Sequence, residues 1–307
     1  RVSTAITIDY KTKLTVIVDD NFDGSTLKNE VITDGGYKGS GSGTIEKNGV
    51  VKDASVDYQN RKINWTITVN RFNYDMLNWK LEDTMSDGLV FNKESFKIFE
   101  QGSKTPLQLG VDYEFVGEPT DKKFNVQFIG ALADPGTNKT YVISYATDFA
   151  REQEKFTNTA VSKWKDADGK DHQNTGKKDQ TVTKNYVVDA SKGGEYSAQT
   201  KRIKWTTIVN YNQQTLKNAT ISDPILGEQT YVPNSAKLYE VTINPDGSVK
   251  LGTEVANAAA ESAKTVSANL PDGSTKAYAL VFETSLEGSL ITDKPYLNLS
   301  LIHISEP

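Results

Sequence analysis

Short stretches in which apolar and polar residues alternate recur along the chain and predict β-strands. Residues 63–69 read Ile-Asn-Trp-Thr-Ile-Thr-Val, and residues 203–209 read Ile-Lys-Trp-Thr-Thr-Ile-Val. Because successive side chains of a strand point to opposite faces, this period of two gives each strand one apolar and one polar face. Turn sequences such as Asn244-Pro-Asp-Gly247 and Asp134-Pro-Gly136 separate the runs. The pattern predicts an all-β protein.

One stretch is compatible with a helix. Residues 254–264 contain three consecutive alanines, Ala258-Ala-Ala260. The stretch has no apolar stripe that could pack against a core. We therefore expect a short helix or a loop insertion there.

The chain contains an internal repeat at an offset of 140 residues (205 − 65 for two tryptophans). Residues 52–100 align without gaps with residues 192–240. Each repeated lysine precedes its asparagine by 106 residues (158 − 52 and 298 − 192), so later insertions cancel. A chain of 307 residues is expected to hold about two domains. The repeated residues pair Lys52 with Lys192, Trp65 with Trp205, Asp83 with Asp223, and Asn158 with Asn298.

The first residues are similar to the end of such a module. Ile8-Asp-Tyr10 matches Ile143-Ser-Tyr145, and Leu27-Lys-Asn29 matches Phe156-Thr-Asn158. The chain also starts at Arg1, without Met and in the middle of this pattern. We therefore interpret the sequence as an internal fragment that opens with a truncated third copy.

Two stretches of flexible composition mark the expected joints. The first is the glycine-rich segment 35–43, and the second is the polar segment 165–180. The last nine residues, 299–307, resemble a translated sequencing adapter, so we expect an assembly artefact in which His303 carries no meaning. The expected order is residues 1–35 as the C-terminal strands of a preceding module, 36–164 as a first full module, 165–180 as a linker, 181–298 as a second full module, and 299–307 as the artefact.

Composition narrows the possible functions. The net charge is −5 and lysines are scattered among acidic residues, which argues against nucleic-acid binding. Cysteine is absent, so disulfides, thiol nucleophiles and cysteine-based zinc sites are excluded. No apolar run approaches the roughly 20 residues that span a bilayer. We expect a monomer without a cofactor or a membrane span in this fragment.

The repeated residues permit an amide bond between two side chains. The lysine amine must be neutral, and burial can make it so. A carboxyl group that stays protonated in an apolar site can polarise the asparagine amide and move protons while ammonia leaves. Strands that hold amine and amide in contact supply proximity. The cross-link candidates are Lys52 with Asn158 and Lys192 with Asn298, and the promoting acids are Asp83 and Asp223.

Simpler interpretations of these residues remain open. A single lysine is more often a solvated surface group. Asp83 and Asp223 could have no role other than to start turns. Trp65 and Trp205 could exclude water from a reactive site, or they could be ordinary core residues. Lys47 and Lys184 also align if gaps are allowed, so they compete for the role of nucleophile.

The ordered set of motifs resembles the collagen-binding-domain superfamily of Gram-positive adhesins. The resemblance covers nearly the whole chain and implies immunoglobulin-like or jelly-roll β-sandwiches, autocatalytic isopeptide bonds and attachment to the cell wall. The second copy departs from it, because Phe282 stands for a tyrosine and the sequence after Asn298 does not continue as in the first. The residues that carry the resemblance are Lys52, Ile63-Asn-Trp65, Asn70, Asp83, Tyr145-Ala-Thr147 and Phe156-Thr-Asn158, and then Lys192, Ile203-Lys-Trp205, Asn210, Asp223, Phe282-Glu-Thr284 and Tyr296-Leu-Asn298.

One further motif matches a calcium loop. Asp19, Asn21, Asp23 and Glu30 follow the spacing of an EF-hand loop. The flanking segments 4–10 and 14–18 look like strands rather than helices. A polar hairpin loop is therefore the alternative that we favour.

Three functions follow from the fragment. In the first, the chain is part of a cell-surface adhesin, and its cross-linked modules serve as a stalk or bind a ligand. This adhesin would be extracellular and would be joined to peptidoglycan through a C-terminus outside this sequence. In the second, the modules are a head that clasps collagen or another host matrix protein between them. In the third, the chain is a carbohydrate-active enzyme, which has no positive support. A nucleophile–histidine pair would need His172, in the polar stretch expected to be a linker.

Overall fold

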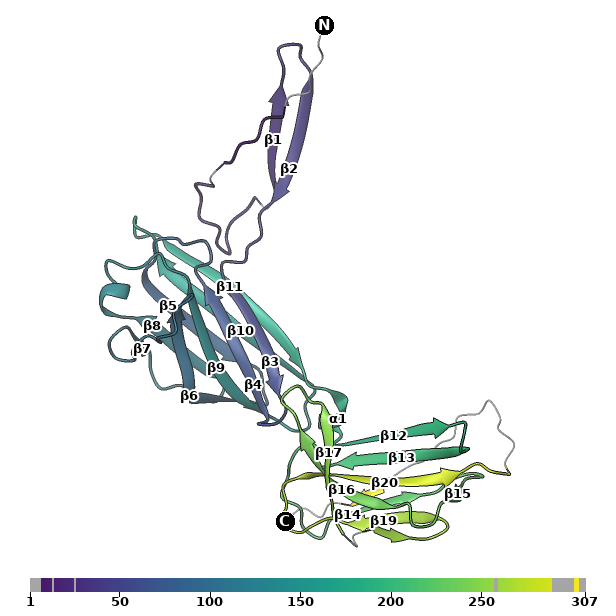
Figure 1. Ribbon diagram of the computed structural model, residues 1–307. Coiled ribbons are helices and arrows are strands. Elements are labelled where there is room, and N and C mark those ends of the chain that lie inside the picture. The colour runs from purple at the N-terminus through teal and green to yellow at the C-terminus, as the bar shows by residue number, and fades with distance from the viewer. Residues whose placement is uncertain (1–6, 13, 25, 257–258, 289–300, 304–307) are drawn as a thin grey trace.

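The computed structural model describes residues 7–12, 14–24, 26–256, 259–288 and 301–303. Almost all regular structure in these ranges is β-strand, which confirms the all-β prediction. Figure 1 shows a hairpin, a first sandwich and a second sandwich in series along the chain. We call the sandwich formed by residues 45–181 module 1 and the one formed by residues 190–303 module 2. No helix in the described ranges has the length and apolarity to cross a membrane.

Module 1 consists of two packed antiparallel sheets. One has the strand order β3-β4-β9-β6, and the other has the order β11-β10-β5-β8-β7. Every strand of the first pairs with a neighbour in register, and β4 lies between β3 and β9. The strands are β3 Val51–Asp57, β4 Lys62–Val69, β5 Leu77–Met85, β6 Leu89–Glu100, β7 Tyr113–Phe115, β8 Lys123–Phe128, β9 Tyr141–Phe149, β10 Lys155–Lys165 and β11 Asp171–Thr181, with the short 3-10 turn η1 Gly130–Leu132.

The alternation in the sequence builds the core of module 1. In β4, Ile63, Trp65 and Ile67 face inward and are fully buried, whereas Asn64 between them is exposed. Trp79 of β5 meets them from the facing sheet and is also fully buried. Burying each such side chain contributes about 1.5–3 kcal/mol. The two inner faces therefore hold the sandwich together.

Module 2 repeats this plan. Its sheets have the orders β12-β13-β20-β16-β17 and β18-β19-β14-β21, and β15 pairs with β20. Ser222 pairs with Leu301, just as Glu82 pairs with Val161 in module 1, so β21 has the register of β10. The strands are β12 Ala190–Ser197, β13 Arg202–Val209, β14 Thr220–Pro224, β15 Thr230–Tyr231, β16 Lys237–Ile243, β17 Val249–Glu254, β18 Ala259–Glu261, β19 Thr265–Asn269, β20 Ala277–Ser285 and β21 Leu301–His303.

The N-terminal part forms a separate hairpin. Strand β1 (Thr26–Ile32) pairs with β2 (Lys38–Thr44), and all of their described residues are exposed. The glycine-rich joint expected at 35–43 is therefore mostly a strand, and the hairpin ends at residue 44 rather than 35. Residues 7–12 and 14–18 are not strands, although their alternation suggested it. An alternation of apolar and polar residues does not produce a strand unless a neighbouring strand pairs with the segment.

The prediction of a linker at residues 165–180 is wrong. These residues form the end of β10, a turn, and most of β11, which pairs with β10 over its whole length. The inward residues of β11 are His172, Asn174 and Gly176, so its buried face carries no apolar signal. The modules are instead joined by residues 182–189, which contain the short helix α1 (Lys184–Val187). The described part of the helix-compatible stretch 254–264, which leaves out residues 257 and 258, contains β18 and a turn but no helix.

An aromatic joint packs the two modules against each other. The ring of Tyr58, between β3 and β4, lies 4.1 Å from the ring of Tyr186 in α1, centroid to centroid. The Tyr58 backbone N–H donates to the Pro245 carbonyl of module 2 (3.0 Å). Arg61 Nη1 donates to the Asn212 carbonyl (2.5 Å). One buried hydrophobic cluster consequently runs through both modules.

The Tyr58→Ala variant tests this joint. Removing a buried aromatic ring should lower the free energy of unfolding by roughly 3–5 kcal/mol and separate the melting of the modules. Calorimetry should resolve two transitions in Tyr58→Ala, whereas the unfolding of the two modules should be more strongly coupled in the parent chain. Tyr58→Phe, which removes only the hydroxyl that accepts the Thr183 N–H (3.1 Å), should cost about 1 kcal/mol. An unshifted single transition in Tyr58→Ala would contradict a packed joint.

Candidate functional site

Lys52 is a buried lysine in the middle of module 1. It lies on β3, its side chain is completely shielded from solvent, and it points between the two sheets. Its Nζ lies 5.6 Å from the ring centroid of Trp65 and 5.4 Å from that of Tyr145. The aromatic rings exclude water and provide a cation–π contact. A lysine in such surroundings needs polar partners, and the facing sheet supplies them.

Asp83 and Tyr145 are these partners. Asp83 lies on β5 of the opposite sheet, is completely buried, and its Oδ2 accepts a hydrogen bond from Lys52 Nζ. Lys52 Nζ also donates to the Tyr145 hydroxyl (2.9 Å). The Tyr145 hydroxyl donates in turn to Asp83 Oδ1 (3.0 Å). Tyr145 therefore ties amine and carboxyl into one network.

Asn158 completes the group. It lies on β10, two residues before Ala160, which pairs with Asp83 of β5. Asn158 and Ala160 therefore face inward on the same side of β10, close to Asp83. Its Nδ2 donates to the Tyr145 hydroxyl (2.7 Å). Its Oδ1 is buried and has no hydrogen-bond partner among the described residues. The structure thus brings Lys52, Asp83 and Asn158 together, as their repeated spacing suggested.

The burial of this group changes its ionisation. Desolvation lowers the pKa of Lys52, although the neighbouring Asp83 charge acts in the opposite direction. Desolvation raises the pKa of Asp83 against the effects of Lys52, Tyr145 and Asn158. It also raises the pKa of Tyr145 well above its ordinary value. Both shifts in the pair favour a neutral amine beside a protonated carboxyl, the combination that amide chemistry needs.

Module 2 holds a related pair with different neighbours. Lys192 Nζ donates to Asp223 Oδ2 (2.6 Å) and lies 5.3 Å from the centroid of Trp205. The Lys192 side chain is 17% exposed, whereas that of Lys52 is fully buried. Burial still lowers the pKa of Lys192. Asn298 lies outside the described residues.

A hydroxyl changes position between the two modules. Trp65 pairs with Tyr145, whereas Trp205 pairs with Phe282, so module 2 lacks the phenol. Thr207 pairs with Lys192 at the place where Ile67 pairs with Lys52. The Thr207 hydroxyl donates to Asp223 Oδ2 (3.2 Å). The sequence shows that phenylalanine replaces tyrosine in module 2. Only the structure shows that Tyr145 and Thr207 each place a hydroxyl beside the aspartate of their own module.

Each tryptophan is held by the threonine of the repeated motif. Trp65 Nε1 donates to Thr147 Oγ1 (3.0 Å), and Trp205 Nε1 donates to Thr284 Oγ1 (3.0 Å). All four residues are buried. These bonds satisfy the indole nitrogens and fix the rings beside the lysines. The Tyr/Phe-x-Thr motif thus positions the walls of both sites.

The competing lysines lie elsewhere. Lys47 is near the N-terminal segment, where its Nζ lies 3.4 Å from the Asp20 carbonyl. Lys184 is exposed in α1. Neither forms part of the buried group around Asp83. The structure therefore selects Lys52 among the lysines that the alignment allowed.

The calcium-loop candidates take other roles. Asp19 accepts a hydrogen bond from the Asn21 backbone N–H (2.9 Å) and contacts His172 (2.7 Å). Glu30 lies on the exposed strand β1, away from the segment that holds Asp19. Among the residues that the structure describes, no three His, Cys, Asp or Glu side chains form a group suited to a metal. His172 itself is buried in β11, not in a linker.

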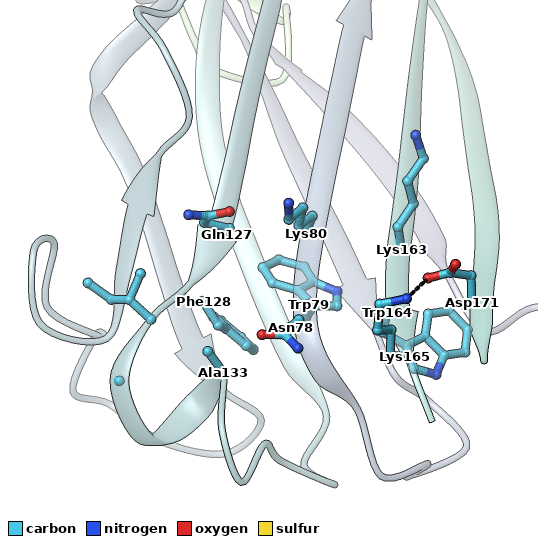
Figure 2. Close-up of a pocket in the computed structure, with 12 residues that line it drawn as sticks. Asn78, Trp79, Lys80, Gln127, Phe128, Ala133, Lys163, Trp164, Lys165 and Asp171 are labelled. Atoms are coloured by element: carbon cyan, nitrogen blue, oxygen red, sulfur yellow. Dashed lines mark hydrogen bonds and ion pairs between the residues drawn. The ribbon is translucent and has the colours of Figure 1, made fainter. Parts of the chain in front are cut away.

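The outer surface of module 1 carries a groove of about 620 Å³. Figure 2 shows the side chains of Asn78, Lys80 and Gln127 around it. Trp79, Phe128 and Trp164 also contribute to its lining, although these residues are almost fully buried. An ion pair between Lys165 and Asp171 (2.6 Å) closes one end. Trp164 Nε1 is buried and finds no acceptor within the described part of the chain. The groove therefore presents mainly polar and charged side chains to a ligand.

Several solved structures that are similar to this chain are described as adhesin domains. The collagen-binding subdomain of the Enterococcus faecalis surface protein ACE is 18% identical, with a TM-score of 0.35 over 42% of this chain and 94% of that one. The collagen-binding domain of a Staphylococcus aureus adhesin is 11% identical, with a TM-score of 0.35 over 44% of this chain and 97% of that one. A longer structure of E. faecalis ACE, described as binding its ligands by the collagen Hug model, is 19% identical, with a TM-score of 0.35 over 51% of this chain and 60% of that one. No curated protein matches the chain.

A family model decides the relationship. The model described as "Collagen binding domain" matches residues 43–173 and 188–299, which together make up more than half of the chain. The first match begins where the hairpin β1–β2 ends, and the second begins next to β12. The two matches therefore coincide with the two sandwiches. The chain belongs to the collagen-binding domain family.

Proposed function

We propose that the chain is part of a Gram-positive cell-surface adhesin whose sandwich modules are locked by internal Lys–Asn isopeptide bonds. The observation that carries the proposal is the buried group of Lys52, Asp83, Tyr145 and Asn158. A lysine, an acid and an asparagine on three strands have no other evident reason to meet inside a core. An extracellular chain without cysteine would gain from such a cross-link.

The geometry supports a direct reaction. The neutral Lys52 amine attacks Cγ of Asn158, and the C–N bond to the amide nitrogen breaks so that ammonia leaves. Asp83 in its protonated form stabilises the charge that develops on Asn158 Oδ1, and it then takes up and returns the transferred protons. Tyr145 holds amine, acid and amide in place through its three hydrogen bonds. The bond replaces the buried Lys52 amine and the Asn158 amide with one neutral secondary amide, and Asp83 remains beside it.

The position of the bond suits a mechanical role. Lys52 lies on β3 in one sheet, and Asn158 lies on β10 in the other. A covalent bond between them would join the two sheets near the two ends of the module. Tension applied along the chain would then pass through the bond rather than through hydrogen bonds between strands. We infer a tether that resists shear, with peptidoglycan attachment through residues outside this sequence.

The second module and the N-terminal hairpin fit the same plan. Lys192 and Asp223 are in contact, and the repeat assigns Asn298 as their acceptor. In the hairpin, Asn29 Nδ2 donates to the Tyr10 hydroxyl, as Asn158 does to Tyr145. Strand β1 with β2 also resembles β10 with β11, because each asparagine lies on the first strand of a hairpin. These observations support a preceding module that ends at residue 44.

The ligand is the second part of the proposal, and we infer a host matrix protein such as collagen. The groove on module 1 provides a ligand surface lined by the polar side chains of Asn78, Lys80 and Gln127. Clasping a ligand between the modules would require the joint at Tyr58 and Tyr186 to open. The packed joint favours a fixed tandem over a clasp. No described feature favours a carbohydrate-active enzyme.

Intact mass tests the cross-links. The chain should be lighter than its sequence by one ammonia for each module that reacts. Lys52→Ala should restore one ammonia and Lys192→Ala the other. Asp83→Asn, which keeps the shape but removes the acid, should leave module 1 unreacted. A mass equal to the plain sequence would contradict the proposal.

Chemical unfolding tests the energetic effect. A bond that closes about 100 residues should stabilise module 1 by roughly 4–5 kcal/mol in the chain-entropy model. Asn158→Ala should lose at least this amount in guanidinium titrations. Thr159→Ala is the matched control, because the neighbouring side chain faces outward on the same strand. Equal midpoints for the two variants would argue against a covalent lock.

Binding to immobilised collagen tests the ligand surface. Lys80→Glu, on the exposed face of β5 inside the groove, should reverse a charge there and reduce binding at least about tenfold, without changing the melting temperature. Asn64→Arg, on the outer face of the other sheet, should bind like the parent. If binding instead disappears only when the modules are separated, the clasp between modules replaces the groove.

A further inference from the structure

The N-terminal segment is fastened to module 1 by a cluster of polar contacts. Val18 is 1% exposed, and its backbone N–H donates to the Tyr74 hydroxyl (2.8 Å). Asp20 donates its backbone N–H to the Gln173 carbonyl of β11 (2.9 Å) and accepts the Thr175 N–H (3.0 Å). Residues 17–21 thus lie along β11, far from β1 in the hairpin. The contacts join the part before module 1 to the module itself.

His172 lies at the centre of this attachment, between two carboxylates. Its Nδ1 is 2.7 Å from Asp19 Oδ2, and its Nε2 is 2.9 Å from Asp166 Oδ2. The imidazole is buried, with its side chain only 4% exposed. Its ring stacks on Trp164, with centroids 5.6 Å apart. The histidine therefore connects the N-terminal segment, the turn before β11 and the core in one contact set.

Both carboxylates are held in place before they meet the ring. Asp19 Oδ1 accepts the Asn21 N–H (2.9 Å). Asp166 Oδ1 accepts the backbone N–H groups of Asp168 (3.0 Å) and Lys170 (2.9 Å). An ionised carboxylate carries no proton, so the Oδ2 atoms that face His172 can act only as acceptors.

The chemistry of the ring follows from its two neighbours. A neutral imidazole has one N–H and one lone pair, so it can donate to only one carboxylate. The other carboxylate would then face a lone pair inside a buried site, which is unfavourable. An imidazolium donates to both and also neutralises part of their charge.

We propose that His172 is a doubly protonated clamp that fixes residues 17–21 onto the end of module 1. The clamp attaches the chain before module 1 through charged contacts, whereas the joint after module 1 is aromatic. A stalk built in this way would transmit force through charged and aromatic joints rather than through flexible linkers. The inference does not depend on the cross-links.

The charge requirement sets the direction of its pH dependence. The groups that face the ring are Asp19 from the N-terminal segment, Asp166 from the turn and Trp164 from β10. The hydrogen bond from His172 holds the pKa of Asp166 below its ordinary value, so that contact persists into mild acid and is lost only as the pH falls through the lowered value. The neighbouring hollow also contains Asp23, Asp75, Asp168, Asp171 and Lys170.

Nuclear magnetic resonance of the whole chain tests the clamp directly. At pH 7, the nitrogen shifts of His172 should show both ring nitrogens protonated, with assignment through His172→Gln. Asp19→Asn and Asp166→Asn should each move the ring toward the singly protonated form. Asp168→Asn is the matched control, since it changes the same charge in the same turn without a side-chain bond to His172. A singly protonated ring at pH 7 in the parent chain would overturn the proposal.

Hydrogen exchange in the same samples tests the attachment. The amides of Val18 and Asp20 should exchange at least about tenfold faster in Asp19→Asn and His172→Gln, while core amides of β4 keep their rates. Asp168→Asn should leave both amides unchanged. If His172→Gln leaves Val18 and Asp20 as protected as in the parent, His172 fills space and does not hold the segment.

Discussion

Burial of the Lys52 amine is the constraint on which the rest of the structure depends. A charged amine in a sandwich core carries a large desolvation cost unless polar partners surround it. The partners come from three other strands, β5, β9 and β10, which belong to both sheets. Their meeting fixes how the sheets are aligned, because a shift of one residue would turn Asp83 or Asn158 to the outside. If the amide forms, the Lys52 amine can no longer carry a charge, which removes this cost.

Module 2 shows which parts of the arrangement can vary. The lysine, the acid and the tryptophan are retained, and the tryptophan is held by a threonine in both modules. The hydroxyl beside the acid moves from the aromatic strand to Thr207, on the strand next to the lysine. The variable element is therefore the group that positions the acid. The lysine–acid contact is common to both sites.

The joints explain how the modules act together. After module 1, Tyr58 packs on Tyr186 and makes the hydrophobic cluster continuous. Before module 1, residues 17–21 lie along β11. Both joints are instead held by specific contacts to module 1. A series of stiff units suits a projecting surface protein.

The sequence predicted the strands with alternating residues, the repeat, and the lysine, acid and asparagine that meet in module 1. Those predictions worked because the repeat compares the chain with itself. The sequence did not assign a role to Tyr145, although the Tyr-x-Thr motif contained it, because its hydroxyl acts only through a contact across strands. It missed β11, because His172 and Asn174 are polar residues on an inward face. It also placed flexible joints at residues that form β2 and β11, since glycine and charged residues can pair as edge strands.

The most direct measurement is a crystal structure of this chain at a resolution that separates bonded from non-bonded atoms. Our account predicts continuous density from Lys52 Nζ to Cγ of Asn158, with Asp83 beside the new amide. Separate lysine and asparagine side chains in van der Waals contact, with the amide nitrogen still present, would contradict it.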